Sequence, residues 1–318
     1  MHFKENVLAA HKRIQPDIKK TPLQFSRPMS QMFRAKVYLK WENEQLTGSF
    51  KLRGALNKIR TLSAEEKKKG VVSASTGNHG LAISYAAQLE KVDLTLFLPK
   101  SASPVKVEKL RKYPIALMFH GESCEQAEIY AREYAQKNGR IYISPYNDCD
   151  IVYGQGTLGF EIHEDLPDVE DVLVPVGGGG LIAGIGGYLK SVNPAIRIHG
   201  VEPVNSSFMV ASIRAGKIVE IDEKKTLADG VAGGIEPGSI TFPLCQKYVD
   251  GYLTVTERLI KNSIALLYEK HTKVVEGAAA LYLAGLMKAR DAFRGKKVVL
   301  VVSGGNIAPD LFKKIVRK

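Results

Sequence analysis

The sequence of 318 residues has little cysteine, no long apolar run and no signal peptide. Cys124, Cys149 and Cys245 are odd in number and far apart, without a CxxC pair. This pattern argues against a disulfide framework and a zinc cluster. No apolar stretch approaches the roughly 20 residues of a membrane-spanning helix, and residues 1–16 lack the order of a secretory leader. We therefore expect a cytoplasmic protein with no membrane partner.

Acidic residues are also scarce relative to basic ones. The chain has 45 Lys and Arg against 33 Asp and Glu, a formal net charge of +12. Such a charge can indicate a nucleic-acid-binding protein. The basic residues are scattered, however, and no aromatic-basic module of a DNA-binding or RNA-binding domain is present. We expect no nucleic-acid partner and a basic surface that attracts anionic small molecules.

What the sequence does have is alternation of strand-like and helix-like segments, typical of an α/β fold with parallel sheets. Strands are expected at 21–26, 36–42, 71–75, 93–99, 115–121, 141–146, 171–176, 196–203, 251–256 and 297–303. The length favours two lobes, each with a mostly parallel sheet flanked by helices.

The expected domain boundaries follow the changes in pattern. We predict a large domain at 1–63 and 148–318, a small domain at 70–147, and a linker over the charged segment 64–69. Residues 216–245 are glycine-rich and weakly patterned, which predicts a long loop with at most short elements.

The segment Trp41–Ala55, WENEQLTGSFKLRGA, places Lys51 at the beginning of a helix. Ser49 is the expected N-cap, which puts Lys51 in the first turn, where the helix dipole opposes a cation. No acidic residue lies between Gln45 and Leu62. A lysine so placed loses its proton more easily, and the neutral amine attacks carbonyl groups. The alternative is an ordinary solvated lysine.

Four consecutive glycines, 177–180, follow the expected strand 171–176 and precede an apolar helix. Successive backbone N–H groups without side chains can surround an anion at a helix N-terminus. The spacing is neither that of a P-loop nor that of a dinucleotide-binding turn. We predict a phosphate site, with a merely flexible turn as the alternative.

Two further motifs lie at the carboxyl ends of expected strands, where open parallel sheets bind ligands. In Ser75-Thr76-Gly77-Asn78-His79-Gly80 the backbone amides and hydroxyls can hold a carboxylate, and Asn78 can bond a phenolic oxygen. Ser303, in Ser303-Gly304-Gly305-Asn306, can offer a hydroxyl to a ring nitrogen. Simple capping and a plain turn remain open as alternatives.

Together these motifs, in this order and at these separations, resemble the fold-type II pyridoxal-phosphate enzymes, whose fold is that of tryptophan synthase β. The resemblance is greatest to the branch of threonine/serine dehydratases and serine racemases, and it covers nearly the whole chain. It implies pyridoxal 5'-phosphate as the cofactor, an amino acid as the substrate and a homodimer as the assembly.

The resemblance also implies a role for each matching residue. Lys51 is the lysine that binds the cofactor aldehyde and then acts as the base, and Phe50 packs beside the ring. Asn78 bonds the cofactor 3-oxygen, Gly177, Gly178, Gly179 and Gly180 cradle the phosphate, and Ser303 meets the ring nitrogen. The substrate carboxylate is held by residues at the start of the following helix, namely Ser75, Thr76, Gly77, Asn78 and His79.

Two positions depart from the racemase pattern. Thr76 stands where racemases of this branch have a catalytic serine, so a hydroxyl is present but on a stiffer side chain. Glu202 matches the first ligand of the racemases' divalent-metal site, but Phe208 occupies the position of a later aspartate. We therefore predict no metal ion, and we expect Glu202 to cap or pair locally.

The activity that these features imply is β-elimination of water from threonine, serine or a close β-hydroxy amino acid, giving a 2-oxo acid and ammonia. One alternative is an amino-acid racemase with side dehydratase activity. Another is a non-catalytic protein that binds a phosphate ligand in the glycine loop. Because the sequence ends twelve residues after Asn306, we expect no appended effector-binding domain.

Overall fold

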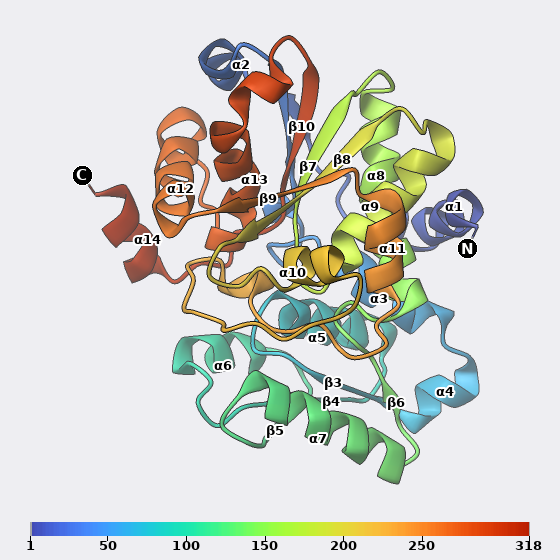
Figure 1. Ribbon diagram of the computed structural model, residues 1–318. Helices are drawn as coiled ribbons and strands as arrows, with labels where there is room; N and C mark the ends of the chain where they lie inside the picture. Colours follow the sequence, from blue (N-terminus) through green and yellow to red (C-terminus); the bar gives the residue numbers. More distant parts are fainter. Residues whose placement is uncertain (1, 318) are drawn as a thin grey trace.

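The computed structural model describes residues 2–317 and arranges them around two sheets, which lie one above the other in Figure 1. The larger sheet has the strand order β1 (Leu23–Phe25), β2 (Lys36–Trp41), β10 (Lys297–Val302), β7 (Asp171–Pro175), β8 (Arg197–Pro203) and β9 (Gly251–Val255). The smaller sheet has the order β5 (Ala116–Phe119), β4 (Leu94–Leu98), β3 (Val71–Ala74) and β6 (Ile141–Tyr142). Only the β1–β2 pair is antiparallel among the described strands. The predicted α/β class with two mostly parallel sheets is confirmed.

Helices connect the strands and cover the sheets (Figure 1). The α-helices are α1 (Phe3–Ile14), α2 (Arg27–Phe33), α3 (Lys51–Thr61), α4 (Ala64–Lys69), α5 (Asn78–Glu90), α6 (Pro104–Leu110), α7 (Cys124–Lys137), α8 (Cys149–Asp165), α9 (Gly180–Val192), α10 (Phe208–Ala215), α11 (Thr241–Tyr248), α12 (Glu257–His271), α13 (Gly277–Lys288) and α14 (Pro309–Val316). The short 3-10 helices are η1 (Gln15–Asp17), η2 (Glu42–Glu44), η3 (Asp229–Val231) and η4 (Arg290–Phe293). No helix among residues 2–317 is long and apolar enough to cross a membrane.

The charged segment 64–69 forms the helix α4. Ser63 accepts a hydrogen bond from the Glu66 N–H, and the Glu66 side chain accepts one from the Ser63 N–H, which is a complete capping box. The long predicted loop holds η3 and the start of α11. Periodicity alone does not indicate elements this short, because one or two turns give too few apolar repeats.

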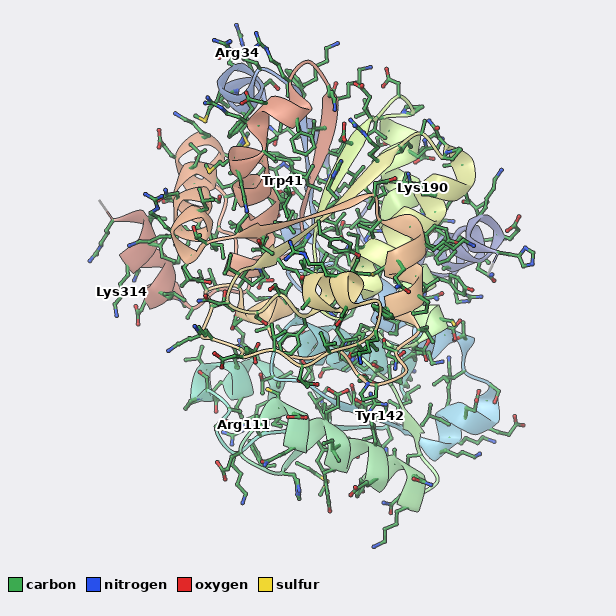
Figure 2. All side chains as sticks on the ribbon, viewed as in Figure 1. Arg34, Trp41, Arg111, Tyr142, Lys190 and Lys314 are labelled. Carbon is green, nitrogen blue, oxygen red and sulfur yellow. The ribbon has the colours of Figure 1, made fainter. Side chains whose placement is uncertain are left out.

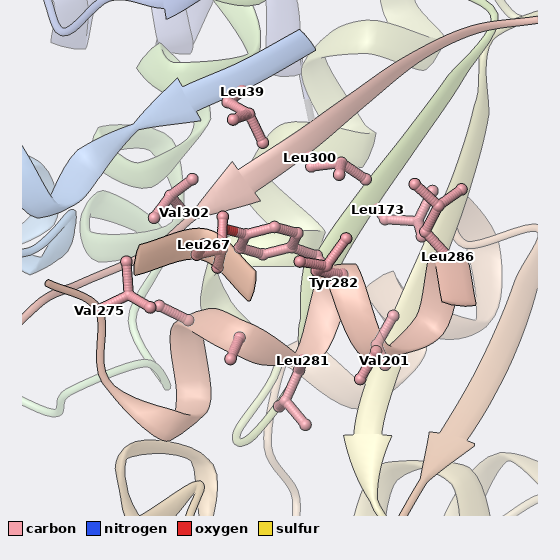
Figure 3. Packing of buried hydrophobic residues seen from close by; sticks show 14 of the residues in the cluster. Leu39, Leu173, Val201, Leu267, Val275, Leu281, Tyr282, Leu286, Leu300 and Val302 are labelled. Carbon is pink, nitrogen blue, oxygen red and sulfur yellow. The ribbon is translucent and has the colours of Figure 1, made fainter. Parts of the chain in front are cut away.

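One apolar cluster joins α13 to the larger sheet. Figure 3 shows Tyr282 of α13 among Leu267, Val302 and Leu300, and all four side chains are fully buried. A helix that is apolar all round is expected to be buried. The cluster makes α13 the central helix on this face of the sheet.

A second cluster includes the apolar stripe of α3. Leu52, Leu56 and Ile59 are fully buried and pack in one cluster with residues of the smaller sheet such as Val71 and Leu94. The helix that begins with Lys51 therefore contributes to the core of the smaller lobe.

The other side of α3 is held by buried charges. Arg53 donates to both oxygens of Glu42, at 2.8 Å each, and to both oxygens of Glu161, at 2.7 and 2.9 Å. Lys40 donates to Glu161 at 2.6 Å. All four side chains are fully buried. The two cations balance the two anions, and they fix α3 against β2, η2 and α8.

The basic residues do not form one patch. Figure 2 shows Arg34, Arg111, Lys190 and Lys314 on separate sides of the molecule. Many basic side chains have acidic partners, such as Lys190 with Asp250 at 2.8 Å. A groove that binds a nucleic-acid backbone needs clustered lysine and arginine side chains, and these four residues do not form such a cluster.

Candidate active site

The site lies at the carboxyl ends of the central strands. Strand β10 pairs with β2 on one side and with β7 on the other, so Ser303 and the glycine loop follow adjacent parallel strands. The chain runs from β7 through β8 to β9 and then returns to place β10 beside β7. Ligands of open α/β sheets bind at such a reversal of strand order.

Helix α3 begins at Lys51 itself, and its N-cap is Phe50. The predicted Ser49 cap is wrong. Ser49 is fully buried and forms an isolated bridge with Gly304, so its position is set by a distant segment. The Lys51 ammonium donates to the Pro145 carbonyl oxygen at 3.0 Å, and its nitrogen lies 5.3 Å from the centre of the Phe50 ring.

Burial lowers the pKa of Lys51 from its ordinary value to about 8, and the negative charges of Glu276 and Glu128 oppose this shift. Desolvation of an ammonium favours the neutral amine. The structure encloses the amine in a pocket whose lining includes Phe50, Asn78 and Tyr146. The result is an amine that is neutral in part of the molecules near neutral pH.

Close contacts or a left-handed backbone account for glycine at positions 177, 178 and 179. A Cβ atom on Gly178 would lie 2.5 Å from the ring of Tyr146, and one on Gly177 would lie 2.8 Å from the Val231 carbonyl oxygen. Gly179 has φ +86°, a left-handed conformation that favours glycine. The loop leads into α9, whose first N–H groups have no partner within the helix. These features form a cradle that suits a phosphate group.

The predicted residues meet in one pocket. Its lining comprises Phe50, Lys51, Asn78, Tyr146, Pro175, Gly177, Gly178, Gly179, Gly180, Leu181, Gly230, Val231, Glu276, Ala278 and Ser303. Segments from both lobes and from both ends of the chain contribute. The structure thus brings together Lys51, the glycine loop, Asn78 and Ser303, which are far apart in the sequence.

The remaining predicted residues, Ser75 to Gly77 and His79, flank Asn78 without lining the pocket. Gly77 is the N-cap of α5, and its N–H donates to the Ser75 hydroxyl at 3.2 Å. The ring of His79 is buried and lies 3.0 Å from the Ser73 hydroxyl. Burial, assisted by the charge of Lys51, lowers the pKa of His79 to about 3, so its ring stays neutral.

Sequence reasoning missed Tyr146 and Glu276. The Tyr146 hydroxyl accepts a hydrogen bond from the Glu236 N–H at 2.9 Å, and its ring packs against Gly178. Glu276 stands immediately before the apolar helix α13 and is 6% exposed. An acid next to a fully apolar helix was the signal available for Glu276, whereas nothing in the sequence marks Tyr146.

Glu202 has the local role expected of it. Its two carboxylate oxygens accept hydrogen bonds from the N–H groups of Met209 and Val210, at 3.0 and 2.7 Å, at the start of α10. Burial raises the pKa of Glu202 to about 8. Among residues 2–317 no group of three or more His, Cys, Asp and Glu side chains is placed to hold a metal ion.

Comparison with known proteins connects this site to a family. Residues 14–304 match the family model described as pyridoxal-phosphate dependent enzyme. The chain is 42% identical over 314 residues to L-threonine ammonia-lyase of Thermotoga maritima, an alignment that covers 99% of this chain and 78% of that protein.

Solved structures agree with this match. The processed form of threonine deaminase isoform 2 from Solanum lycopersicum has a TM-score of 0.93 and 32% identity, with 98% of this chain and 91% of that chain covered. Maize serine racemase has a TM-score of 0.92 and 32% identity, with 98% of this chain and 95% of that chain covered.

Proposed function

The chain belongs to the family of pyridoxal-phosphate-dependent enzymes, in the branch of threonine/serine dehydratases and serine racemases. We propose that it is an ammonia-lyase for L-threonine, L-serine or a close β-hydroxy amino acid. Its reaction removes water and releases ammonia and a 2-oxo acid. The observation that carries this proposal is the enclosed amine of Lys51 in the same pocket as the glycine cradle. The names of the relatives from Thermotoga maritima and Solanum lycopersicum support the substrate class.

The residues present fit pyridoxal 5'-phosphate. A glycine loop that leads into the N-terminus of α9 suits its phosphate, and a buried amine with a lowered pKa suits its aldehyde. Gly177 to Gly180 would hold the phosphate, Lys51 the aldehyde carbon, Asn78 the 3-oxygen and Ser303 the ring nitrogen, with Phe50 beside the ring. When bound, this cofactor delocalises the negative charge that develops on the substrate α-carbon.

The chain itself supplies the base and the positioning. The Lys51 amine takes the α-proton, and its pKa of about 8 is near the pH at which a general base is effective. The N-terminus of α5 holds the substrate carboxylate against the positive end of the helix. The N–H groups of Ser75 and Gly77 already donate to the Phe97 carbonyl and the Ser75 hydroxyl, so the carboxylate is left to those of Thr76, Asn78 and His79. His79 is neutral and bonded to Ser73, so it donates no proton.

A racemase with side dehydratase activity is the second candidate. Thr76 provides a hydroxyl beside Asn78, and serine racemase from maize shares the fold. A panel of β-hydroxy amino acids, assayed for ammonia, 2-oxo acid and inverted amino acid, separates the two. We expect 2-oxo acid to exceed D-serine. The reverse ratio would make racemisation the main activity, and protein that stays colourless with added cofactor would favour a phosphate-binding role.

Gly179→Ala tests the cradle. We expect pyridoxal phosphate to bind about tenfold more weakly, because relief of the strain at a positive φ, which costs about 1–3 kcal/mol, would move the N–H groups of the loop away from the phosphate. The added methyl group would also lie 2.9 Å from the Met209 side chain and 3.0 Å from the Cys245 sulfur. Spectrophotometric titration of the cofactor measures the dissociation constant.

Gly295→Ala is the matched control for this variant. Gly295 has φ +78°, and a Cβ there would meet no atom within 4 Å. The Gly295→Ala variant has the same kind of backbone strain away from the pocket, so the affinity of this variant for the cofactor is expected to stay at the wild-type value. Equal weakening in both variants would remove the support for a phosphate cradle.

We also propose that the protein is a homodimer whose interface includes Leu46 and Val274. These side chains are 44% and 43% exposed, and they stand on segments joined by the Lys273–Glu44 ion pair at 2.6 Å. Changing both residues to lysine should give a monomer in sedimentation analysis. Lysine at Leu89, which is 38% exposed on α5, should leave the dimer intact.

We propose that the large domain comprises 1–63 and 148–318, that the small domain comprises 70–147, and that segment 64–69 joins them. The division of the strands between two sheets supports these bounds.

We also propose that the protein acts in the cytoplasm. All three cysteines are free and Cys124 is exposed, which suits a reducing compartment.

A further inference from the structure

Glu276 is a buried acid of the pocket to which the proposed mechanism gives no task. It is the N-cap residue of α13, is 6% exposed, and lines the pocket together with Lys51 and Asn78. Buried carboxyl groups need hydrogen bonds or a counter-charge, because desolvation of an anion is costly. The contacts of this carboxyl group therefore indicate what it does.

The carboxylate of Glu276 determines the orientation of the Asn78 amide. Its Oε1 accepts a hydrogen bond from Asn78 Nδ2 at 2.6 Å, and its Oε2 accepts one from the Asn306 N–H at 3.2 Å. Asn306 Nδ2 donates in turn to Asn78 Oδ1 at 2.8 Å. A flipped Asn78 amide would place donor against donor and acceptor against acceptor. Glu276 and Asn306 together thus select one orientation of the Asn78 amide.

Close packing leaves the carboxylate little freedom to move. A Cβ on Gly304 would lie 2.5 Å from Glu276 Oε1, and one on Gly230 would lie 3.6 Å from the same oxygen. Glu276 therefore touches the segments around Asn78, Gly230 and Gly304, all of which border the pocket.

Glu276 is also coupled to Lys51 by charge. Its negative charge is the larger of the two that favour the protonated form of Lys51, ahead of that of Glu128. Burial and the charge of Asp229 raise the pKa of Glu276, while the hydrogen bonds from Asn78 and Asn306 and the charge of Lys106 lower it, and the net result is a pKa of about 7. Together with Lys51, these are the groups whose charges and hydrogen bonds act on the carboxylate.

We propose that Glu276 is a positioning residue of the active site. Its carboxylate holds the Asn78 amide in the orientation that the cofactor 3-oxygen meets, and it places a negative charge in the same pocket as the Lys51 nitrogen. This inference rests on the proposed function, because it assumes that Lys51 and Asn78 bind pyridoxal phosphate.

The test uses the full chain loaded with pyridoxal phosphate. The pH at which the visible absorption band of the bound cofactor changes reports the proton on the Lys51 nitrogen. In Glu276→Gln this pH is expected to fall by about one pH unit, since a nearby negative charge is lost. In Glu276→Ala the same fall is expected together with a cofactor dissociation constant about tenfold higher, because Asn78 also loses its acceptor. Glu276→Gln keeps an acceptor and should lose less affinity.

Glu202→Gln is the matched control. Glu202 is also buried, at 1% exposed, and accepts two backbone hydrogen bonds, but it does not line the pocket. In Glu202→Gln the absorption band of the bound cofactor should change at the same pH as in the wild-type protein. If both Glu276 variants titrate as wild type and Glu276→Ala keeps its affinity, the inference is wrong while the cofactor function stands. If the wild-type chain gives no band with pyridoxal phosphate, the proposed function and this inference are both wrong.

Discussion

Replacing Lys51 with alanine is expected to lower α-proton exchange by at least about a thousandfold, within the range attributed to a positioned general base. The structure shows one hydrogen bond from the amine, to the Pro145 carbonyl, so the fold loses little. Exchange of the substrate α-proton with deuterated solvent, followed by nuclear magnetic resonance, measures the effect. Ammonia release should fall in parallel.

Lys58→Ala is the control for this variant. Lys58 lies on the same helix and forms ion pairs with Asp148 at 2.8 Å and Asp150 at 3.2 Å, away from the pocket lining. It should exchange the α-proton at close to the wild-type rate. Persistent exchange in Lys51→Ala, with circular dichroism unchanged, would mean that another group is the base.

The second large effect concerns stability. Arg53→Met is expected to lower the free energy of unfolding by about 3–5 kcal/mol, because removing one partner leaves buried charge uncompensated. In this variant the two buried carboxylates of Glu42 and Glu161 would share one buried cation of the network, Lys40. Urea-induced unfolding followed by circular dichroism gives the change.

Arg60→Met provides the comparison. Arg60 lies near the end of the same helix, and its ion pairs with Asp17 and Glu90 are partly exposed. Solvent screening reduces such pairs to about 1 kcal/mol or less. An Arg53 variant that loses no more stability than the Arg60 variant would show that the buried network contributes little.

Much of the fold could be predicted because its signals are local. The strand patterns and the alternation with helices predicted every strand among residues 2–317. Strand β6 is shorter than predicted, since β3 pairs with it at two positions only. The helices α2, α4, α11 and α14 were not predicted, and α4 in particular has no apolar residue besides Ala64 that could give a periodic pattern.

The site was predictable where one segment carries the whole signal, as in the glycine loop. The motifs at the strand ends indicated Asn78 and Ser303, and the family resemblance implied their roles toward the cofactor. Nothing in the sequence marks Tyr146, and the acid before an apolar helix did not reveal the role of Glu276, because both roles depend on contacts with segments far away in the chain. The Ser49 cap failed for the same reason, since the bridge to Gly304 is visible only in three dimensions.

The double attachment of α3 has a consequence for protein engineering. Excision of residues 70–147 would strip the cover from Leu52, Leu56 and Ile59, each of which is 0% exposed in the intact chain. The remaining fragment would expose the apolar face of α3 to water and aggregate. The smaller lobe is thus no detachable module, and any chimera that exchanges it must carry a surface complementary to this helix.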